Sequence, residues 1–574
     1  MNIGLRYDVQ LPYEERYNRM ASMFNINAVN PDSAAILTAW NLDATAYNST
    51  NPKYPYPAAP PAMYGVWQFA GQNGLPRRAQ YTDWTNGAPR IGFAYRLNDK
   101  TVLRGGMGTF YQSITSNNNS QTGFSQTTNY QSSFDNVNDI PSACVNPLGP
   151  NTCATGAPTG PYSLVNPFPQ GLTQPLGESQ GALANVGQGS TSINLHYKIP
   201  RTYQYSLEIQ RQLPKNVLFD ISFAGNYNLY TDSTRDLGHI ADAAGLANQQ
   251  LAINDATFFS RQVPNPFQGI LPATVSNGVN ATISASSLLN NYPMWGGYTD
   301  SDIGNEVFRS DAMQMRIEKR AFGGTDSKTG VMTFVFSWTW SKEYSTTCCL
   351  GSSWQTSTGA VLKLSPSGST GTLVDFPLQN DNQNMVYAMD SNNKTQEEAF
   401  SGVWDLPLGK GRQFGSSVTG FADKLLSGWR ADYIFTYISG FPVGIPNAEN
   451  FCGNYNAQPS SGQTQGQNEF HWFNNNPSCY ASFPSNTINT YLSPRFSGNV
   501  NNPAAPQLNV AIEKNTTFGE RYKLQFRAES FNITNTAIRP GPGSTTYTSP
   551  TFGILPENQN NFPRLVQLAL KLYF

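Results

Sequence analysis

Connections of very unequal length alternate along this chain, and this pattern constrains the fold more than any other feature. Segments in which apolar and polar side chains alternate every second residue, as in β-strands, lie at residues 2–10, 90–97, 101–111, 201–212, 216–227, 311–320, 331–341, 398–406, 428–440, 508–518, 521–533 and 563–574. The connections between them are short and long in strict turn. Transmembrane β-barrels have this asymmetry, with short periplasmic turns and long outer loops. A soluble β-sandwich does not account for this alternation, because long structureless loops are uncommon in compact domains.

The last two segments have one apolar face and one polar face. In the segment that begins at Arg521, the polar side chains are Lys523, Gln525, Arg527 and Glu529. In the closing segment, the apolar side chains are Val566, Leu568, Leu570, Leu572 and Phe574. We expect the apolar faces to contact outer-membrane lipid and the polar faces to line the lumen of a barrel. The alternative for the terminus alone is the edge strand of a soluble sandwich.

The composition fits this all-β, antiparallel transmembrane barrel with long extracellular loops. Charged residues and aromatic residues each make up 13% of the chain, whereas charged residues alone are about a quarter of a typical soluble protein. The formal net charge is -1, which indicates no nucleic-acid partner. The sequence contains no run of about eighteen apolar residues, so it predicts no transmembrane helix.

The chain begins inside a predicted strand. Ile3, Leu5, Tyr7 and Val9 alternate with polar or small residues, and no basic region followed by an apolar core precedes them. An outer-membrane protein needs an export signal, so we expect residues 1–574 to be the carboxy-terminal part of a longer protein. We also expect these strands, taken alone, to form an open, curved sheet, because strand geometry is linked to the number of strands in the complete barrel.

Several phrases of the sequence resemble the outer-membrane TonB-dependent receptors of the Oar-like type. These phrases are APRIGFAYRLNDKTVLRGGMGTFY at 88–111, RTYQYSLEIQRQLPKNVLFDISFAGNYN at 201–228, VWDLPLGKGRQFG from 403, LQFRAESFNITNT at 524–536 and the ending RLVQLALKLYF. Together they cover most of the predicted strands and turns, whereas the long loops match nothing in this family. The sequence is therefore similar to these receptors in its barrel only.

This resemblance implies a barrel of about 22 strands with a plug in its lumen. The twelve strands predicted here would form part of that barrel, and the plug and the amino-terminal domain are not in this sequence. A TonB energy-transducing system would be a partner only through that plug. The resemblance also implies that the closing strand, Val566 to Phe574, serves barrel assembly and that the outer-membrane assembly machinery is a partner.

Catalysis and cofactor binding find no support in the sequence. The only histidines, His196, His239 and His471, lie far apart, and no HExxH, GxSxG or phosphate-binding glycine motif accompanies them. We therefore predict that the protein is not an enzyme and carries no cofactor or metal.

All six cysteines fall in predicted outer loops, where an oxidising compartment permits disulfides. Cys144 and Cys153 are candidates for one disulfide, and Cys452 and Cys479 for another. Cys348 and Cys349 are adjacent, and the sequence does not indicate their partners. A zinc site is the alternative, but it usually contains a CxxC pair, which the chain lacks.

Loop aromatics form the second group of candidate site residues. Flat rings in exposed loops can stack on sugars, and the candidates are Trp67, Trp84, Trp295, Trp354 and Trp472. The alternative interpretation is that these rings pack the long loops against one another.

The sequence thus predicts part of an outer-membrane barrel that takes up a bulky nutrient, either a glycan fragment or a metal chelate. A structural or adhesive surface protein, in which the barrel is only an anchor, is the alternative. The two hypotheses predict different lumens. A transporter needs polar side chains in its lumen, whereas an anchor could fill its lumen with apolar side chains.

Overall fold

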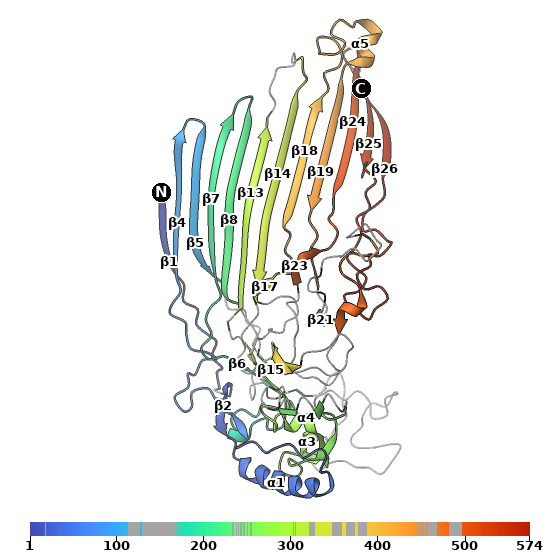
Figure 1. Cartoon of the computed structure of the whole chain (residues 1–574). Helices are drawn as coiled ribbons and strands as arrows, with labels where there is room; N and C mark the ends of the chain where they lie inside the picture. The colour runs from blue at the N-terminus through green and yellow to red at the C-terminus, as the bar shows by residue number, and fades with distance from the viewer. Residues whose placement is uncertain are drawn as a thin grey trace.

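The computed structural model describes residues 1–17, 19–112, 171–231, 257–301, 306–320, 328–346, 359–362, 373–376, 387–444, 468–481 and 496–574, together with short pieces between these ranges. A long sheet dominates the molecule, and smaller elements gather below one end of it (Figure 1). Among the described residues, no helix is both long enough and apolar enough to cross a membrane.

The long sheet has 13 strands, and twelve of them form one continuous antiparallel path. In order across the sheet they are β1 (Asn2–Tyr7), β4 (Gly87–Asn98), β5 (Thr101–Tyr111), β7 (Arg201–Leu213), β8 (Val217–Thr231), β13 (Glu306–Lys319), β14 (Met332–Ser345), β18 (Gln396–Asp405), β19 (Trp429–Ile438), β24 (Gln507–Phe518), β25 (Tyr522–Phe531) and β26 (Leu565–Tyr573). The thirteenth strand, β17 (Ala388–Met389), pairs with the end of β14. All twelve predicted strands are confirmed.

The predicted boundaries differ by four or five residues at β8, β13 and β14, and β8 and β13 are paired with each other. Both strands extend several residues further than predicted at the ends joined by a long connection, where Glu306 is opposite Thr231. The register between them shifts between Glu306 and Val307. On the apolar face of β13, the charged residues Arg309 and Asp311 interrupt the alternation there, so the sequence pattern stops before the hydrogen-bonded ladder does.

All short connections lie at one end of the sheet and all long connections at the other, as the sequence predicts (Figure 1). At the short-connection end, the β18–β19 connection contains the helix α5 (Gly420–Leu426). By the rule for outer-membrane barrels, this end is periplasmic and the long-connection end is extracellular.

The sheet has one apolar face and one polar face, because successive side chains of a strand point to opposite sides. We call residues that face one another across successive strands a rung. One apolar rung consists of Leu207, Phe223, Met313 and Trp340. The neighbouring rung, on the polar face, consists of Ser206, Ala224, Ala312 and Ser341. We assign the apolar face to lipid and the polar face to the lumen.

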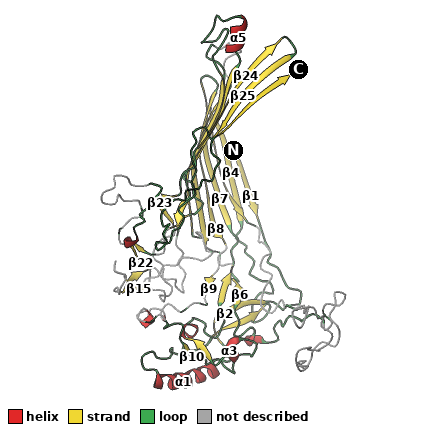
Figure 2. Cartoon of the chain, turned by 90° about the vertical axis from the view of Figure 1, so that its right-hand side faces the viewer, coloured by secondary structure: helices red, strands yellow, loops and turns green. Residues whose placement is uncertain are grey.

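The sheet is open rather than closed into a cylinder. Within the described residues, β1 pairs only with β4 and β26 pairs only with β25. In the side view, β24 and β25 diverge from the other strands, so the sheet does not lie in one plane (Figure 2). The expectation of an open, curved sheet is confirmed.

Three long connections fold together into one compact unit, which we call the loop module. It contains residues 19–86, 171–200 and the described part of 235–301. Its elements are β2 (Ala21–Val29), α1 (Ser33–Thr50), β3 (Tyr64–Phe69), η1 (Gly181–Leu183), β6 (Ser190–Ile193), β9 (Arg235–Asp236), β10 (Gln262–Pro264), α3 (Ser276–Val279), β11 (Thr282–Ser284), α4 (Ala285–Leu288) and β12 (Tyr298–Ser301). The sequence predicts only loops here, whereas the structure has a unit with its own hydrophobic core.

The core of the loop module is built from large apolar side chains of all three connections. Its fully buried members include Ile36, Trp40, Met63, Val263, Phe267 and Met294. Helix α1 contributes Ile36 and Trp40, which are spaced so that they share one face of the helix. The Trp40 indole nitrogen also donates a hydrogen bond to the carbonyl oxygen of Pro57, at 2.9 Å, so its one polar group is satisfied.

The remaining described elements belong to the other outer loops. They are β15 (Gly359–Leu362), β16 (Leu373–Phe376), β20 (Pro442–Gly444), β21 (Glu449–Asn450), η2 (Pro477–Cys479), β22 (Tyr480–Ala481) and β23 (Phe496–Asn501). A second, smaller apolar cluster joins the β19–β24 and β25–β26 connections through Phe473, Tyr480 and Phe552.

Candidate functional site

The polar face of the sheet carries a rung of alternating charge near the end that holds the short connections. Asp405, Arg430, Glu513 and Arg527 oppose one another in that order across β18, β19, β24 and β25. The Arg430 Nε lies 2.8 Å from the Asp405 Oδ1, and Arg527 forms ion pairs with both Glu513 and Glu529. Opposite charges on directly facing residues stabilise a sheet, so this charged rung fits its strand register.

A second group of polar contacts lies on the same face of β5, β7 and β8. The Arg104 Nη1 is 3.0 Å from the Glu208 Oε1, and the Gln210 amide donates to the Asp220 carboxylate at 3.3 Å. Both carboxylates therefore have a partner within the described sheet. The polar face thus carries charged side chains on both of these groups of strands, which suits the wall of an aqueous channel.

Between these two groups and the extracellular end lies a hollow in the polar face, which we call the lumen hollow. Its volume is about 550 Å³. It forms where one rung contains only small side chains, namely Gly92, Gly106, Ser206, Ala224, Ala312 and Ser341. Large side chains at this rung would fill the space. The hollow therefore exists because all six of these side chains are small.

Hydrogen-bonding groups surround the lumen hollow. Gln204, Asn226, Ser310 and Gln314 line it, and the Arg90 guanidinium lies at one end, 4.4 Å from the centre of the Phe110 ring. In the described part of the chain, the Oδ1 of Asn226 is buried without a hydrogen-bond partner. A buried amide oxygen of this kind is costly unless a donor reaches it, so the lumen hollow offers an unfilled acceptor to a polar ligand.

The loops above the lumen are held together by hydrogen bonds between distant segments. The Tyr56 hydroxyl donates to the carbonyl oxygen of Pro264 at 2.8 Å, and the Arg261 Nη2 donates to the carbonyl oxygen of Pro55 at 2.9 Å. Burial raises the pKa of the Tyr56 phenol and lowers the pKa of the Arg261 guanidinium. Both contacts join the first long connection to the third, so they fix the shape of the loop module.

The predicted polar face of β25 has the expected register. Gln525 opposes Lys571, Arg527 opposes Ala569 and Glu529 opposes Gln567 on β26. Lys523 opposes Tyr573, and its ammonium lies 5.7 Å from the centre of that ring. On the other face, the closing strand exposes the whole predicted apolar set, which consists of Val566, Leu568, Leu570, Leu572 and Phe574.

Two of the predicted ligand-stacking tryptophans are buried instead. Trp67 and Trp295 lie in the core of the loop module, where both contact the ring of Phe24, so neither can offer a ring face to a ligand. For these two residues the ligand interpretation is wrong, and the alternative of loop packing holds. The physical reason is that three long connections need a shared core, which large aromatic rings fill most effectively.

The other candidate tryptophans have different surroundings. Trp84 is 61% exposed beside β1, where its carbonyl oxygen accepts a hydrogen bond from Tyr7 at 2.6 Å. Trp472 is half-buried against the second loop cluster, and its indole nitrogen donates to the carbonyl oxygen of Asn501 at 2.7 Å. Trp354 lies outside the described residues.

Cys452 and Cys479 form a disulfide, with their Cα atoms 5.4 Å apart. It ties the chain near β21 to β22, next to the second loop cluster. Cys144, Cys153, Cys348 and Cys349 lie outside the described residues. Among the described residues, no group of three or more His, Cys, Asp or Glu side chains is arranged to hold a metal ion.

The lumen hollow is the site feature that sequence reasoning missed. Its small residues come from strands far apart in sequence, and each is ordinary within its own strand. Only the strand register, which brings Gly106, Ser206 and Ala224 onto one rung, reveals the hollow. The single available signal was the pair of glycines in the phrase LRGGMG, because glycine within a strand often marks a close approach of other groups.

Solved structures of outer-membrane proteins resemble this chain over part of their length. The outer membrane transporter YddB from Escherichia coli is 8% identical, over 89% of this chain and 42% of its own, with a TM-score of 0.32. The siderophore receptor PirA from Acinetobacter baumannii is 10% identical, over 86% of this chain and 41% of its own, with a TM-score of 0.30. The ferripyoverdine receptor of Pseudomonas aeruginosa is 6% identical, over 89% of this chain and 35% of its own, with a TM-score of 0.29. This chain thus spans less than half the length of each.

A comparison with curated proteins found no match to the sequence. The family model described as "Outer membrane beta barrel domain", in contrast, matches residues 1–567. This match covers nearly the whole chain, and it confirms the predicted fold class and the predicted location. The chain therefore belongs to the outer membrane β-barrel domain family and resides in the outer membrane.

Proposed function

We propose that this chain forms part of the wall of a TonB-dependent transporter that takes up a bulky nutrient, either a glycan fragment or a metal chelate. The observation that carries the proposal is the lumen hollow within a polar, charged sheet face. A barrel that served only as an anchor would need no hollow lined with free hydrogen-bonding capacity. We expect no catalytic activity.

The chemistry of the lumen hollow favours a neutral or weakly anionic ligand rich in oxygen atoms. Amides and hydroxyls, such as those of Gln204, Asn226 and Ser310, exchange hydrogen bonds with sugar hydroxyls or with the oxygen atoms of a chelate. Arg90 adds one cationic donor at the edge of the hollow. A mobile plug could use the same groups when it slides along this wall.

The proposal includes the rest of the protein. The exposed edges of β1 and β26 leave backbone groups unpaired, which costs several kcal/mol per group in lipid. Further strands, about ten if the resemblance to 22-stranded receptors holds, would pair with these edges and close the barrel. A plug in the same protein would contact TonB, and the assembly machinery would recognise the strand that ends at Phe574.

Filling the lumen hollow tests the proposal directly. Ala224→Trp places a large ring in the hollow, whereas Ala528→Trp makes the same change on the lipid-facing side of β25 and serves as the matched control. Each variant is introduced into the complete protein in its own outer membrane. Cells are then supplied with labelled oligosaccharides or with labelled ferric chelates, with and without a protonophore.

We expect energy-dependent uptake of one of these two classes, lost in Ala224→Trp and kept in Ala528→Trp. Uptake that persists when the membrane is de-energised would contradict a TonB-dependent role. Uptake that is equal in both variants would show that the lumen hollow plays no part in transport.

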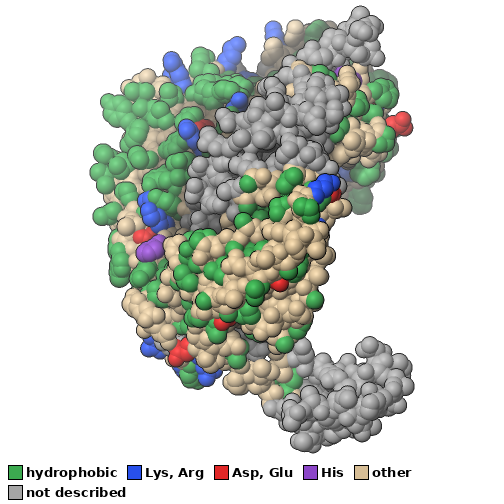
Figure 3. All heavy atoms as spheres, turned by 60° about the horizontal axis from the view of Figure 1, so that its bottom comes forward, with side chains coloured by type: hydrophobic (Ala, Val, Ile, Leu, Met, Phe, Trp, Pro, Cys, Tyr) green, Lys and Arg blue, Asp and Glu red, His purple; other side chains and the backbone are tan. Residues whose placement is uncertain are grey.

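A second candidate function is adhesion, and the loop module favours it. Residues of three connections share one hydrophobic core, so this part of the long-connection end presents one folded surface rather than three separate loops. The face visible in Figure 3 carries only scattered charged side chains among uncharged ones, a composition suited to contact with neutral glycans. Binding of intact cells to a glycan-coated surface, with no energy-dependent uptake, would favour this alternative.

A further inference from the structure

The lipid-facing side of the sheet has clear upper and lower limits along β13. Lys319 marks the periplasmic limit and Asp311 the extracellular limit, and Ile317, Met315 and Met313 lie between them on the same face. Eight residues at about 3.4 Å each span about 27 Å, which matches the apolar band of about 25 Å in outer-membrane barrels. Positions along this face can therefore be assigned to one leaflet or the other.

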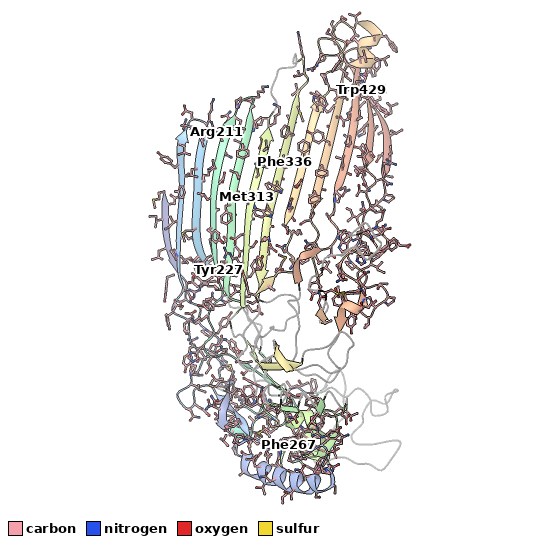
Figure 4. All side chains as sticks on the ribbon, viewed as in Figure 1. Arg211, Tyr227, Phe267, Met313, Phe336 and Trp429 are labelled. Atoms are coloured by element: carbon pink, nitrogen blue, oxygen red, sulfur yellow. A yellow bond between two sulfur atoms is a disulfide. The ribbon has the colours of Figure 1, made fainter. Side chains whose placement is uncertain are left out.

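A second hollow, which we call the lipid-side hollow, lies in the extracellular half of this band. Its volume is about 580 Å³. The apolar side chains that line it are Leu207, Ile209, Ile221, Phe223, Met313 and Trp340. Figure 4 labels Met313 on β13, near the middle of the long sheet. The volume falls within the range of small-ligand sites in proteins, which is about 300 to 1,000 Å³.

Charged side chains lie at the extracellular end of the lipid-side hollow. Lys342 and Asp311 oppose each other across β14 and β13, and both line the hollow. The Asp311 carboxylate is already occupied, because it accepts a hydrogen bond from the Tyr205 hydroxyl and lies 2.7 Å from the Arg309 Nε. In the described part of the chain, Lys342 is exposed and forms no ion pair. This cluster therefore carries one uncompensated positive charge.

Gly225 makes room for the contact between Tyr205 and Asp311 on the lipid-facing surface. Gly225 lies on the same rung as Tyr205, Asp311 and Lys342. A Cβ atom at Gly225 would collide with the Tyr205 ring and lie 2.6 Å from the Asp311 Oδ1. The absent side chain thus lets Tyr205 reach across β8 and neutralise part of the charge of Asp311, while Lys342 is left free.

Aromatic residues show that the cluster lies at the membrane surface. The next rung towards the extracellular end contains Tyr203, Tyr227, Arg309 and Tyr344. It lies about 7 Å further along the strands, because two residues separate successive rungs of one face. Tyrosines at this position form the aromatic girdle of a barrel at the level of the lipid headgroups. Lys342 can extend its ammonium to that level.

We propose that the lipid-side hollow binds a phosphate-bearing glycolipid of the extracellular leaflet. One acyl chain of this lipid lies in the hollow against Phe223, Met313 and Trp340, and its phosphate contacts Lys342 and Arg309. The uncompensated positive charge selects an anionic lipid, because a cation at the membrane surface gains its stabilisation from a nearby anion. The position in the outer half of the apolar band selects the extracellular leaflet. This inference does not depend on the proposed transport function.

The test uses the complete protein, purified from outer membranes in a mild detergent. Diphosphoryl lipid A, monophosphoryl lipid A and phosphatidylglycerol are added separately, and bound lipid is counted by native mass spectrometry. Lys342→Gln removes the free cation. Lys319→Gln is the matched control, because Lys319 is on the same face at the periplasmic limit. Met313→Trp fills the hollow without changing any charge.

We expect one molecule of diphosphoryl lipid A to bind to the unchanged protein. Lys342→Gln should weaken its retention about fivefold, the effect of one cation beside an anionic lipid headgroup, and Lys319→Gln should not. Met313→Trp should abolish retention altogether, because the new ring fills the hollow, and this variant keeps the test valid if Lys342→Gln does not fold. Equal retention in all variants would overturn the proposal. Equal binding of phosphatidylglycerol and lipid A would overturn the assignment to a glycolipid of the extracellular leaflet.

Discussion

The two-faced character of the sheet predicts opposite effects of the same substitution at neighbouring residues. Met315 lies midway between Lys319 and Asp311 on the lipid-facing side, about 14 Å from each limit of the apolar band. Gln314 is the adjacent residue on the polar face, where it is opposite Ser222 and Thr339. Met315→Arg and Gln314→Arg therefore place one guanidinium at the same depth, in lipid and in the lumen respectively.

Met315→Arg should lower the free energy of unfolding by about 2 to 4 kcal/mol, the cost of arginine on the lipid side of a barrel at the midplane. This is roughly a 30- to 700-fold change in the folding equilibrium, at about 1.4 kcal/mol per factor of ten. Gln314→Arg should change it by less than about 0.5 kcal/mol, because the new charge remains in a wet, polar environment. Guanidinium titration of the complete protein in phospholipid vesicles, followed by tryptophan fluorescence, measures both values.

Two outcomes would refute the assignment of the faces. A larger loss for Gln314→Arg would mean that the faces are inverted, because a slip of one residue exchanges them along the whole strand. An equal, large loss at both positions would mean that neither face borders water, which excludes a polar lumen on this part of the sheet. Unchanged slopes of the titration are needed for either conclusion, since a changed slope indicates a different unfolding transition.

Further predictions concern the glycine contact and the two folded loop regions. Gly225→Ala should cost about 1 to 3 kcal/mol through overpacking against Tyr205, whereas Gly4→Ala, where a new Cβ atom would have no neighbour within 4 Å, should cost far less in the same titration. Cys452→Ser should destabilise the second loop cluster by about 3 to 5 kcal/mol, seen as faster proteolysis of that loop, and a reductant should then have no further effect. Trp40→Ala should cost the loop module about 3 to 5 kcal/mol, seen as new protease cuts there while the heat-modifiable mobility of the barrel is unchanged.

The sequence was sufficient to predict the strands, their faces and the side on which each connection lies. The reason is that a sheet between lipid and water requires the same alternation in every strand, and each strand reveals it locally. The pairs Leu207 with Phe223 and Ser206 with Ala224 need no long-range information beyond strand order and hairpin register. The order of the strands follows from the antiparallel path, in which strands of the long sheet that are consecutive in sequence lie side by side.

The loop module could not be predicted in this way. Its core joins Phe24 and Trp67 of the first long connection to Trp295 of the third, and four strands of the long sheet lie between these two connections in sequence. No periodicity links these segments, and loops rich in proline, glycine and asparagine give weak local signals. Helix α1 shows the same difficulty, because only Ser33, Ile36 and Trp40 of its eighteen residues are buried. The burial of Trp67 and Trp295 follows from this tertiary packing and not from their own sequence neighbourhoods.

The lumen hollow and the lipid-side hollow lie back to back on the same strands. Ser206, Ala224 and Ala312 form the floor of the first, and the residues that follow or precede them, Leu207, Phe223 and Met313, line the second. In the proposed functions, the small residues on the polar side leave space for a solute, and the large residues on the other side contact a lipid acyl chain. Because a strand has a period of two, a mutation can alter one hollow and leave the other intact. Ala224→Trp should therefore block uptake without releasing lipid A, and Met313→Trp should release lipid A without blocking uptake. Loss of both functions in either variant would instead mean that the substitution had disturbed the shared strands.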